Sequence, residues 1–353
     1  MKRCFSDEIA SVLCEELRGG RYKAGAPLPS VDALRQRFGS GEYAVRHALQ
    51  RLRDEGLISL KQRMGAVVTA RASFAWKGRV AFIVVDTSAS YFRQKLAMRL
   101  ARRFREADWD FVPIFIDQAP DGALDLTTIR RYAANGLDLA ILVTDQLKVA
   151  EECDRLSLPY VGLNSYLRDS PNARAVIRED SRKCFADLIR TLRERKVKKL
   201  LEFDIERIMD RSFKKQLFEA GISVQRVLCE FDNHRGWNLI DVKRCGYRAV
   251  AGFFADGRHR THPPDVILFD DDYLACGGIV ALLECGLRIP QDVRVVSCSN
   301  SGNEPVVGVT LARIELDPVF YGDAIAAYVL KLLSGRCAAP PRILWRFIPG
   351  ESL

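Results

Sequence analysis

Residues 28–60 read LPSVDALRQRFGSGEYAVRHALQRLRDEGLISL and hold two apolar stripes at helical spacing, separated by Gly-Ser-Gly at 39–41. The stripes consist of Val31, Leu34 and Phe38 in the first half, and Val45, Ala48, Leu49 and Leu52 in the second. The break leaves room only for a tight turn, so the two helices must cross and bury both stripes together. The stretch therefore predicts a helix-turn-helix.

The second of these helices carries an exposed polar row at a spacing of three to four residues. The row is Glu42, Arg46, Gln50 and Arg53, with Tyr43 and His47 beside it. Such a row favours contact with a DNA groove, although it begins with an acid. Glu42 and Arg46 are four residues apart, and an ion pair between them would contribute a few tenths of a kcal/mol.

The flanking sequence extends this helix pair into a small domain. Residues 6–19 predict a preceding helix, with Ser6 as its N-cap and acids in its first turn. After Gly56, two short β-like runs at 57–60 and 66–69 are joined by KQRMG, which predicts a basic hairpin. Three helices followed by a hairpin are the order of a winged helix-turn-helix domain. We place this domain at 1–70 and a linker at 71–78.

Charge is spread unevenly over the 353 residues, whose net charge is +9. Residues 1–75 hold thirteen Lys and Arg against eight Asp and Glu, a net charge of +5, whereas the other 278 residues carry +4. A basic small domain on a near-neutral large one indicates a polyanion as the partner of the small domain. A merely solvated basic surface is the alternative.

From residue 79 onward, continuous apolar runs alternate with helical patterns, which is typical of doubly wound parallel sheets. The strands are too many for one compact sheet, so we predict two α/β lobes. The N-lobe is expected at 79–178 plus 306–336, and the C-lobe at 179–305 plus the C-terminal strand. No helix is predicted between the runs LAILV at 139–143 and YVGL at 160–163.

Composition excludes several classes of protein. No run reaches the roughly 18 apolar residues of a membrane span, and the N-terminus has acids within its apolar periodicity, unlike a signal peptide. We therefore expect a cytoplasmic protein without membrane contact. The ten cysteines are scattered without a CxxC motif, and most lie in apolar runs, so we interpret them as small buried hydrophobic residues.

Two family resemblances rest on longer motifs. GGRYKAGAPLPS at 19–30 and VRHALQRLRDEGLI at 45–58 resemble the GntR-type winged helix domain. PDVILFDDDYLACGGIVALLECGLRIPQDVRVVS at 264–297 resembles the LacI-type sensor, which is itself similar to periplasmic sugar-binding proteins. The resemblance implies an α/β fold class, with an α+β winged helix-turn-helix followed by a two-lobed periplasmic-binding-protein-like domain at 79–353.

The GntR resemblance implies a set of DNA-contacting residues in the head and its wing. We expect these at Ser30, Glu42, Tyr43, Arg46, Lys61, Gln62 and Arg63. The family's second helix opens Ser-Arg-x-Thr, so Glu42 replaces an arginine, and Asp32 stands where a basic residue is common. Glu42 can accept a hydrogen bond from cytosine N4. The sequence therefore predicts a DNA reader of altered specificity, and a structural helix that has lost DNA binding is the alternative.

The LacI resemblance implies an effector site between the lobes, at the carboxyl ends of the strands. The expected ligand-binding residues are Asp86, Tyr91, Phe92, Asn164, Arg211, Trp237, Asp271 and Ser299. Asp271 is expected to bond the ligand and Asp272 to cap the following helix, although Asp86 and Asp271 could themselves be caps and Phe92 could be core. Ser299 replaces an acid of the family, so one strong hydrogen-bond acceptor is missing.

The resulting hypothesis is a homodimeric transcription regulator, a repressor, that binds a double-stranded operator under the control of a small polar effector, a carbohydrate. We expect no cofactor and no metal, because His259 and His262 lie in a loop without an adjacent acid or thiol pattern. An enzyme is disfavoured, since Gly-x-Gly-x-x-Gly, Walker A and Gly-x-Ser-x-Gly motifs are absent. A regulator that acts through a protein partner, and less so an α/β enzyme, remain the alternatives.

Overall fold

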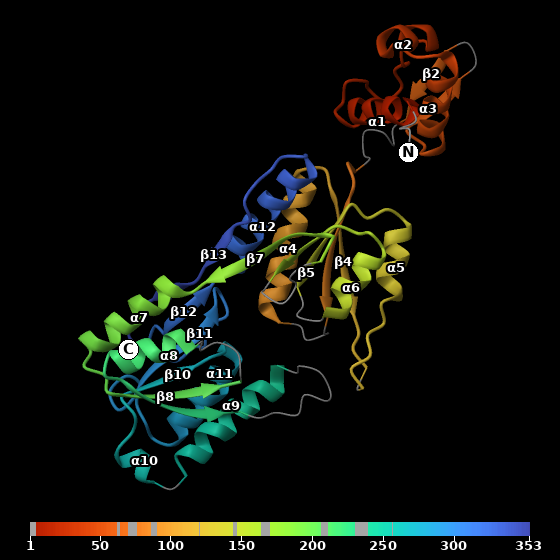
Figure 1. The fold of residues 1–353 in the computed structure, drawn as a ribbon. Coiled ribbons are helices and arrows are strands. Elements are labelled where there is room, and N and C mark those ends of the chain that lie inside the picture. The colour runs from red at the N-terminus through yellow and green to blue at the C-terminus, as the bar shows by residue number, and fades with distance from the viewer. Residues whose placement is uncertain are drawn as a thin grey trace. The chain divides into compact units, whose positions relative to one another are not determined.

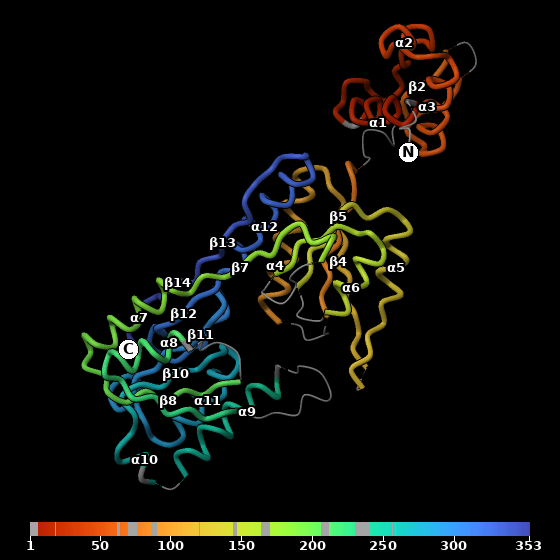
Figure 2. The backbone as a smooth tube through the Cα atoms, viewed as in Figure 1, coloured from red at the N-terminus to blue at the C-terminus, as the bar shows by residue number. Residues whose placement is uncertain are grey.

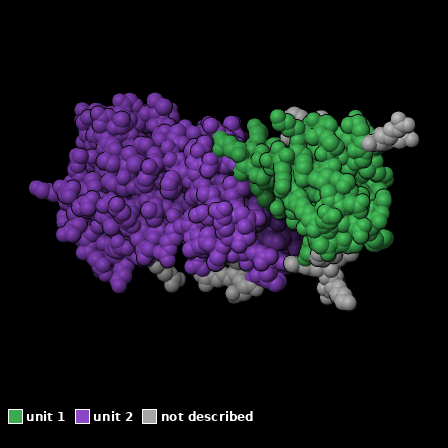
Figure 3. All heavy atoms as spheres, turned by 90° about the horizontal axis from the view of Figure 1, so that it is seen from above, with its two compact units in different colours: residues 1–79, 105–110 green, residues 80–104, 111–353 purple. Residues whose placement is uncertain are grey.

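The computed structural model of the chain describes residues 5–61, 64–69, 76–85, 90–119, 121–143, 147–163, 170–205, 211–229, 239–255 and 257–353. Figure 1 labels the helices and strands of these residues, and Figure 2 traces the course of the chain. The chain divides into two compact units (Figure 3). The first unit consists of residues 1–79 and 105–110, and the second of residues 80–104 and 111–353.

The first unit is a winged helix-turn-helix. Its elements are the helices α1 (Phe5–Arg18), α2 (Val31–Phe38) and α3 (Glu42–Asp54), followed by the antiparallel strands β1 (Ile58–Lys61) and β2 (Gly65–Val68). Both predicted apolar stripes pack into one core with Leu13 and Leu17 of α1, so this prediction is confirmed. Leu34 and Val45 have no exposed surface there, and truncating a buried leucine to alanine costs about 2–5 kcal/mol.

The turn between α2 and α3 depends on Gly39. This residue adopts φ of 57°, in the left-handed region, and its N–H donates to the carbonyl of Arg35 to close the helix. A side chain is strained at this angle, so glycine is the residue that ends α2 within one position. The Gly-Ser-Gly break is thus a helix stop signal as well as a tight turn.

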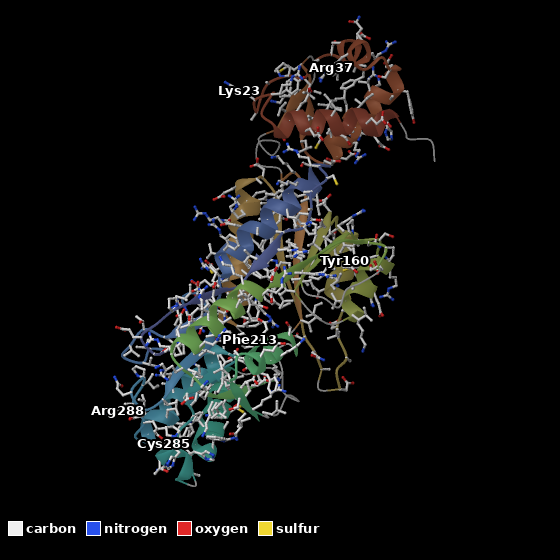
Figure 4. All side chains as sticks on the ribbon, turned by 60° about the vertical axis from the view of Figure 1, so that its left-hand side comes forward. Lys23, Arg37, Tyr160, Phe213, Cys285 and Arg288 are labelled. Carbon is white, nitrogen blue, oxygen red and sulfur yellow. The ribbon has the colours of Figure 1, made fainter. Side chains whose placement is uncertain are left out.

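Ion pairs join the helices of the first unit. Arg37 of α2 donates from Nη1 to Oε2 of Glu16 at 2.8 Å, and Arg21 pairs with the same carboxylate. The hydrogen bond from Arg37 lowers the pKa of Glu16. Arg51 of α3 bonds Asp7 of α1 at 3.0 Å. Arg37, labelled in Figure 4, is therefore committed to holding α2 against α1.

The second unit contains two six-stranded sheets, each with its own helices. The first lobe has the strand order β13-β7-β6-β5-β3-β4. Its elements are β3 (Arg79–Val85), α4 (Tyr91–Glu106), β4 (Asp110–Ile116), α5 (Thr127–Ala134), β5 (Leu139–Val143), α6 (Leu147–Arg155), β6 (Tyr160–Leu163), β7 (Ala173–Asp180), α12 (Pro318–Leu333) and β13 (Arg342–Leu344). The pairings β3–β5, β5–β6, β6–β7 and β7–β13 are parallel. Helix α6 was not predicted.

The second lobe has the strand order β14-β12-β11-β10-β8-β9. Its elements are α7 (Arg182–Glu194), β8 (Lys199–Asp204), α8 (Arg211–Glu219), β9 (Ser223–Leu228), α9 (Leu239–Phe253), α10 (Arg258–Thr261), β10 (Val266–Phe269), α11 (Asp272–Glu284), β11 (Arg294–Asn300), β12 (Ala312–Leu316) and β14 (Arg346–Ile348). Only the pairing of β14 with β12 is antiparallel among those described. Apolar clusters on both faces of this sheet confirm the doubly wound prediction.

The chain passes from one sheet to the other three times. The passages lie between β7 and α7, between β12 and α12, and between β13 and β14. Strand β12 pairs with β11 in the second sheet, so assigning all of 306–336 to the N-lobe is wrong for this strand. Strand β13 pairs with β7 in the first sheet. A strand's own apolar pattern does not encode which sheet it joins, because edge pairing is a tertiary contact.

Two glycines let α9 and α11 pack at close range. A Cβ built on Gly277 of α11 would lie 1.8 Å from the carbonyl oxygen of Lys243, and one on Gly246 of α9 would lie 2.1 Å from that of Leu274. Both distances are shorter than any real contact, so only glycine fits at either position. The first turn of α11, which follows β10, is thereby fixed against α9.

Candidate functional site

The outward face of α3 carries the polar row predicted from the sequence. Val45, Ala48, Leu49 and Leu52 are buried, which leaves Glu42, Tyr43, Arg46 and His47 exposed. Tyr43 has 83% of its surface exposed, although its ring stacks on that of His47 at a centroid distance of 6.2 Å. A large aromatic side chain held out in solvent on a basic helix is suited to contact with a partner.

Glu42 and Arg46 form the predicted ion pair. Nε of Arg46 donates to Oε1 of Glu42 at 2.7 Å, and both side chains are about half exposed or more, at 51% and 67%. A pair of this kind contributes about 0.3–0.5 kcal/mol. A bidentate contact with a base is worth about 1–3 kcal/mol, so the ion pair does not keep Arg46 from reading DNA.

The other DNA-contact candidates are only partly described. Ser30 is the N-cap of α2, where its Oγ accepts from the N–H of Ala33 at 3.2 Å. Lys61 is exposed at the end of β1, at the start of the wing turn. Gln62 and Arg63 lie outside the described residues. Asp32, which replaces a basic residue of the family, pairs with Arg35 at 3.1 Å.

Each lobe offers a ligand position set by its topology. The strand orders β4-β3-β5-β6-β7 and β9-β8-β10-β11-β12 reverse direction beside β3 and β8, respectively. In open α/β sheets, ligands bind at the carboxyl ends of the strands at such a switch point. Of the residues predicted there, Asp86, Asn164 and Trp237 lie outside the described residues, and Arg211 begins α8 with only its backbone described.

The structure exchanges the roles expected of the two aspartates after β10. Asp271 is the N-cap of α11, because its Oδ1 accepts from the N–H groups of Tyr273 at 2.8 Å and Leu274 at 3.1 Å. The expectation that Asp272 caps the helix is therefore wrong. Asp271 has extended backbone angles, whereas Asp272 is already helical and turns its carboxylate away from the helix end. A ligand role for Asp271 stays a prediction.

Asp272 is instead a buried acceptor for the loop after β11. Its Oδ2 accepts from the N–H of Asn300 at 3.1 Å and from Nδ2 of Asn300 and Asn303, both at 3.0 Å. Burial raises the pKa of Asp272, and the hydrogen bonds from the two asparagines oppose that rise. The three residues hold the carboxyl ends of β10 and β11 in one arrangement.

A tyrosine pair joins this polar cluster to the first lobe. The backbone N–H of Tyr91, the first residue of α4, donates to the hydroxyl of Tyr273 at 3.0 Å. The Tyr91 hydroxyl lies 2.4 Å from where a Cβ on Gly302 would be. Gly302 has φ of 86°, so glycine is needed there for both backbone angle and space. Sequence analysis singled out Tyr91 but missed Asp272, Tyr273 and Asn303 as site residues.

The last two candidates have partners within the fold. Phe92 packs edge-on against Tyr321 of α12 at a ring distance of 5.4 Å, which favours the core alternative for this residue. Ser299 is buried in β11, and its Oγ donates to that of Ser297 at 3.2 Å. Neither contact points to a ligand.

Comparison with known families agrees with these two units. The family model of bacterial regulatory proteins of the gntR family matches residues 5–68. The N-terminal domain is a GntR-family domain. This GntR domain spans α1 to β2 and contains the exposed row of α3. The model of the periplasmic binding protein-like domain matches residues 201–353, which begin in β8 of the second lobe. Among curated proteins, no relative of this chain is found.

Solved structures share the fold of the chain that follows the GntR domain. A LacI-family regulator from Arthrobacter sp. FB24, in complex with lactose, is 18% identical with a TM-score of 0.59, covering 78% of this chain and 98% of its own. A sugar-binding LacI-family regulator from Enterococcus faecalis is 18% identical with a TM-score of 0.58, covering 78% and 97%. The Lac repressor dimer bound to operator and the anti-inducer ONPF is 15% identical with a TM-score of 0.61, covering 78% and 93%. These similarities establish the two-lobed fold.

Two further observations concern the described ranges alone. None of their helices combines the length and apolar character that crossing a membrane requires. No group of three or more His, Cys, Asp and Glu side chains in these ranges is arranged to hold a metal ion.

Proposed function

We propose that this chain is a homodimeric transcription repressor that binds an operator through its GntR domain and responds to a small polar effector, a carbohydrate, held between the lobes of its sensor. The observation that carries the proposal is the exposed row of Glu42, Tyr43 and Arg46 at the start of α3, within a GntR domain. A recognition helix reads base edges with its N-terminal residues, which is where this row lies.

Binding to DNA would combine specific and nonspecific contacts. Arg46 has the bidentate geometry that reads guanine, and Glu42 can accept from cytosine N4. Lys61 at the wing supplies charge for phosphate contact, which positions the domain without reading sequence. Helix-turn-helix readers bind two half-sites about one DNA turn apart, so a dimer is the expected active form.

A carbohydrate effector is supported by the site chemistry and by the relatives. Two of the similar structures are described as sugar-binding or as a complex with lactose. The polar cluster of Asp272, Asn300 and Asn303 lies at the carboxyl ends of the strands, where Tyr91 and Tyr273 bring the two lobes together. The strong acceptor that the family carries at position 299 is a buried serine here, which favours an effector with fewer hydroxyl contacts.

The DNA-binding part is tested by selecting binding sites from random duplex DNA with the full-length protein. The selected duplex should be roughly palindromic, and its affinity should fall steeply with salt, with a log–log slope of about −0.9 per phosphate contact. A stable monomer without salt-dependent duplex binding would overturn this part.

The effector part is tested by a thermal-shift screen of lactose and a panel of other mono- and disaccharides. A ligand at 100 times its Kd should stabilise the native state by about 2.7 kcal/mol. Arg211→Ala should remove the effector response and leave operator affinity unchanged. Asp271→Asn tests ligand contact by its charge alone, since asparagine caps a helix equally well. If no sugar shifts the melting temperature while operator binding is intact, the carbohydrate assignment is wrong and the DNA assignment stands.

A further inference from the structure

Two cysteines of the second lobe lie in contact although they are 16 positions apart in the sequence. Cys229 directly follows β9, and Cys245 lies in α9. Both side chains belong to one apolar cluster and are reduced, and their thiols are hydrogen-bonded to each other. The N–H of Cys229 also donates to the carbonyl of Asp204 at 2.8 Å, which holds it beside the end of β8.

We propose that Cys229 and Cys245 are an oxidant-sensitive dithiol, which a hydroperoxide converts to an intramolecular disulfide. The substrate class is a small peroxide such as hydrogen peroxide, which can reach a thiol that larger oxidants cannot.

The two thiols have different roles in this reaction. The S–H of Cys229 and the positive charge of Arg248, one turn further along α9, stabilise a thiolate on Cys245. The hydrogen bond from Cys229 is the larger cause of the lowered pKa of Cys245, and the same bond raises the pKa of Cys229. Since the thiolate is the nucleophile, Cys245 attacks first and Cys229 resolves.

The reaction balances as a two-electron oxidation. The Cys245 thiolate attacks one peroxide oxygen, so that an S–O bond forms and the O–O bond breaks, and the departing oxygen leaves as water after taking a proton. The sulfenic acid on Cys245 is then attacked by the sulfur of Cys229. The S–S bond forms, the S–O bond breaks, and the oxygen leaves as a second water with the proton of Cys229. The peroxide is reduced and the two thiols are oxidised.

The other buried cysteines do not share this chemistry. Burial raises the pKa of Cys153 and that of Cys184 to about 12, so both stay protonated at neutral pH. Their exposed surface is 0% and 2%, against 9% for Cys245. Cys337 is exposed, but it lies in a different segment, after α12. Selectivity for the pair therefore follows from both proximity and thiolate character.

The disulfide would fix the end of β9 to α9. Cys245 precedes Gly246, which lies against the Leu274 carbonyl of α11 with no room for a side chain. The bond therefore ties β9 to the helix pair whose first turn carries Asp271 and Asp272. It closes a loop of 15 intervening residues, which restricts the unfolded chain and should raise the melting temperature of the second lobe.

The test uses reduced full-length protein, exposed to hydrogen peroxide and then alkylated and digested with trypsin without reductant. Trypsin releases Cys229 in residues 227–235 and Cys245 in residues 245–248, so the product is one pair of short linked peptides. The denatured protein should fall from ten titratable thiols to eight and become about 2 Da lighter, and dithiothreitol should reverse both changes.

Three variants separate the roles. Cys229→Ser should leave Cys245 as a sulfenic acid that a dimedone probe labels, whereas Cys245→Ser should yield neither the label nor the linked peptides. Cys184→Ser, a matched buried cysteine of the same lobe, should form the disulfide like wild type. The proposal is overturned if wild-type protein retains both thiols while Cys337 is oxidised, or if either cysteine pairs with another partner. That readout on wild type decides the matter even where a variant fails to fold.

Discussion

Replacing Glu42 separates what this residue does for the helix from what it does for DNA. The Glu42–Arg46 pair has an N–O distance of 2.7 Å, but the two side chains are 51% and 67% exposed. Water screens such a pair, so Glu42→Ala should cost no more than about 0.5 kcal/mol of unfolding free energy. Arg46→Ala should cost as little in stability, yet it should weaken operator binding by about 1–3 kcal/mol, or 5- to 150-fold, if Arg46 reads a base.

The assay is a double-mutant cycle with two readouts. Urea unfolding measures the stability of wild type, Glu42→Ala, Arg46→Ala and the double variant, and fluorescence anisotropy measures their affinity for a selected operator and for a random duplex. Glu42→Arg should select a different DNA sequence and bind random duplex more tightly, because an acid near the phosphates is replaced by a cation. The matched control is Arg190→Ala, which removes one exposed, ion-paired arginine from α7 and should leave specificity unchanged.

Two results would refute this reasoning. If wild type and Glu42→Arg select the same site from random DNA, Glu42 does not read a base. If Arg46→Ala weakens operator and random duplex equally, Arg46 contacts phosphate rather than base edges, and the recognition residues lie elsewhere on the domain.

Three further predictions concern the second unit. Gly277→Ala should destabilise the protein by about 1–3 kcal/mol or more in urea unfolding, because its Cβ would meet the Lys243 carbonyl, whereas Gly252→Ala on α9 has open space and should be neutral or stabilising. Asp271→Ala should cost about 0.5–2 kcal/mol through loss of the α11 cap, and Asp271→Asn should restore it in the same assay. The hydrogen bond from Arg182 lowers the pKa of Asp180 to about 2, so the stability from this carboxylate is present above its ordinary value of 3.8 and is lost as the pH falls toward 2. Melting curves between pH 4 and 2 should therefore fall less steeply for Asp180→Asn than for wild type, and equal slopes would contradict the assignment.

The sequence by itself determined the helix-turn-helix and the α/β class of the second unit. The reason is that local periodicity and burial are linked directly: Val45, Ala48, Leu49 and Leu52 repeat at helical spacing and pack into one core. The predicted Glu42–Arg46 pair also followed from spacing alone, since residues four apart share a helix face. Helix α6 was missed because it is short and its apolar positions are few.

Only the tertiary structure decided which residues of the sensor face one another. Neighbouring aspartates at 271 and 272 look alike in sequence, and the backbone angles at the helix start make the first a cap and the second a buried acceptor. Strand β12 joined the second sheet through its register with β11, which no local pattern specifies. The contact of Tyr91 with Tyr273 and that of Cys229 with Cys245 arise from long-range packing, because chain segments far apart in sequence meet only once the sheets and helices have assembled.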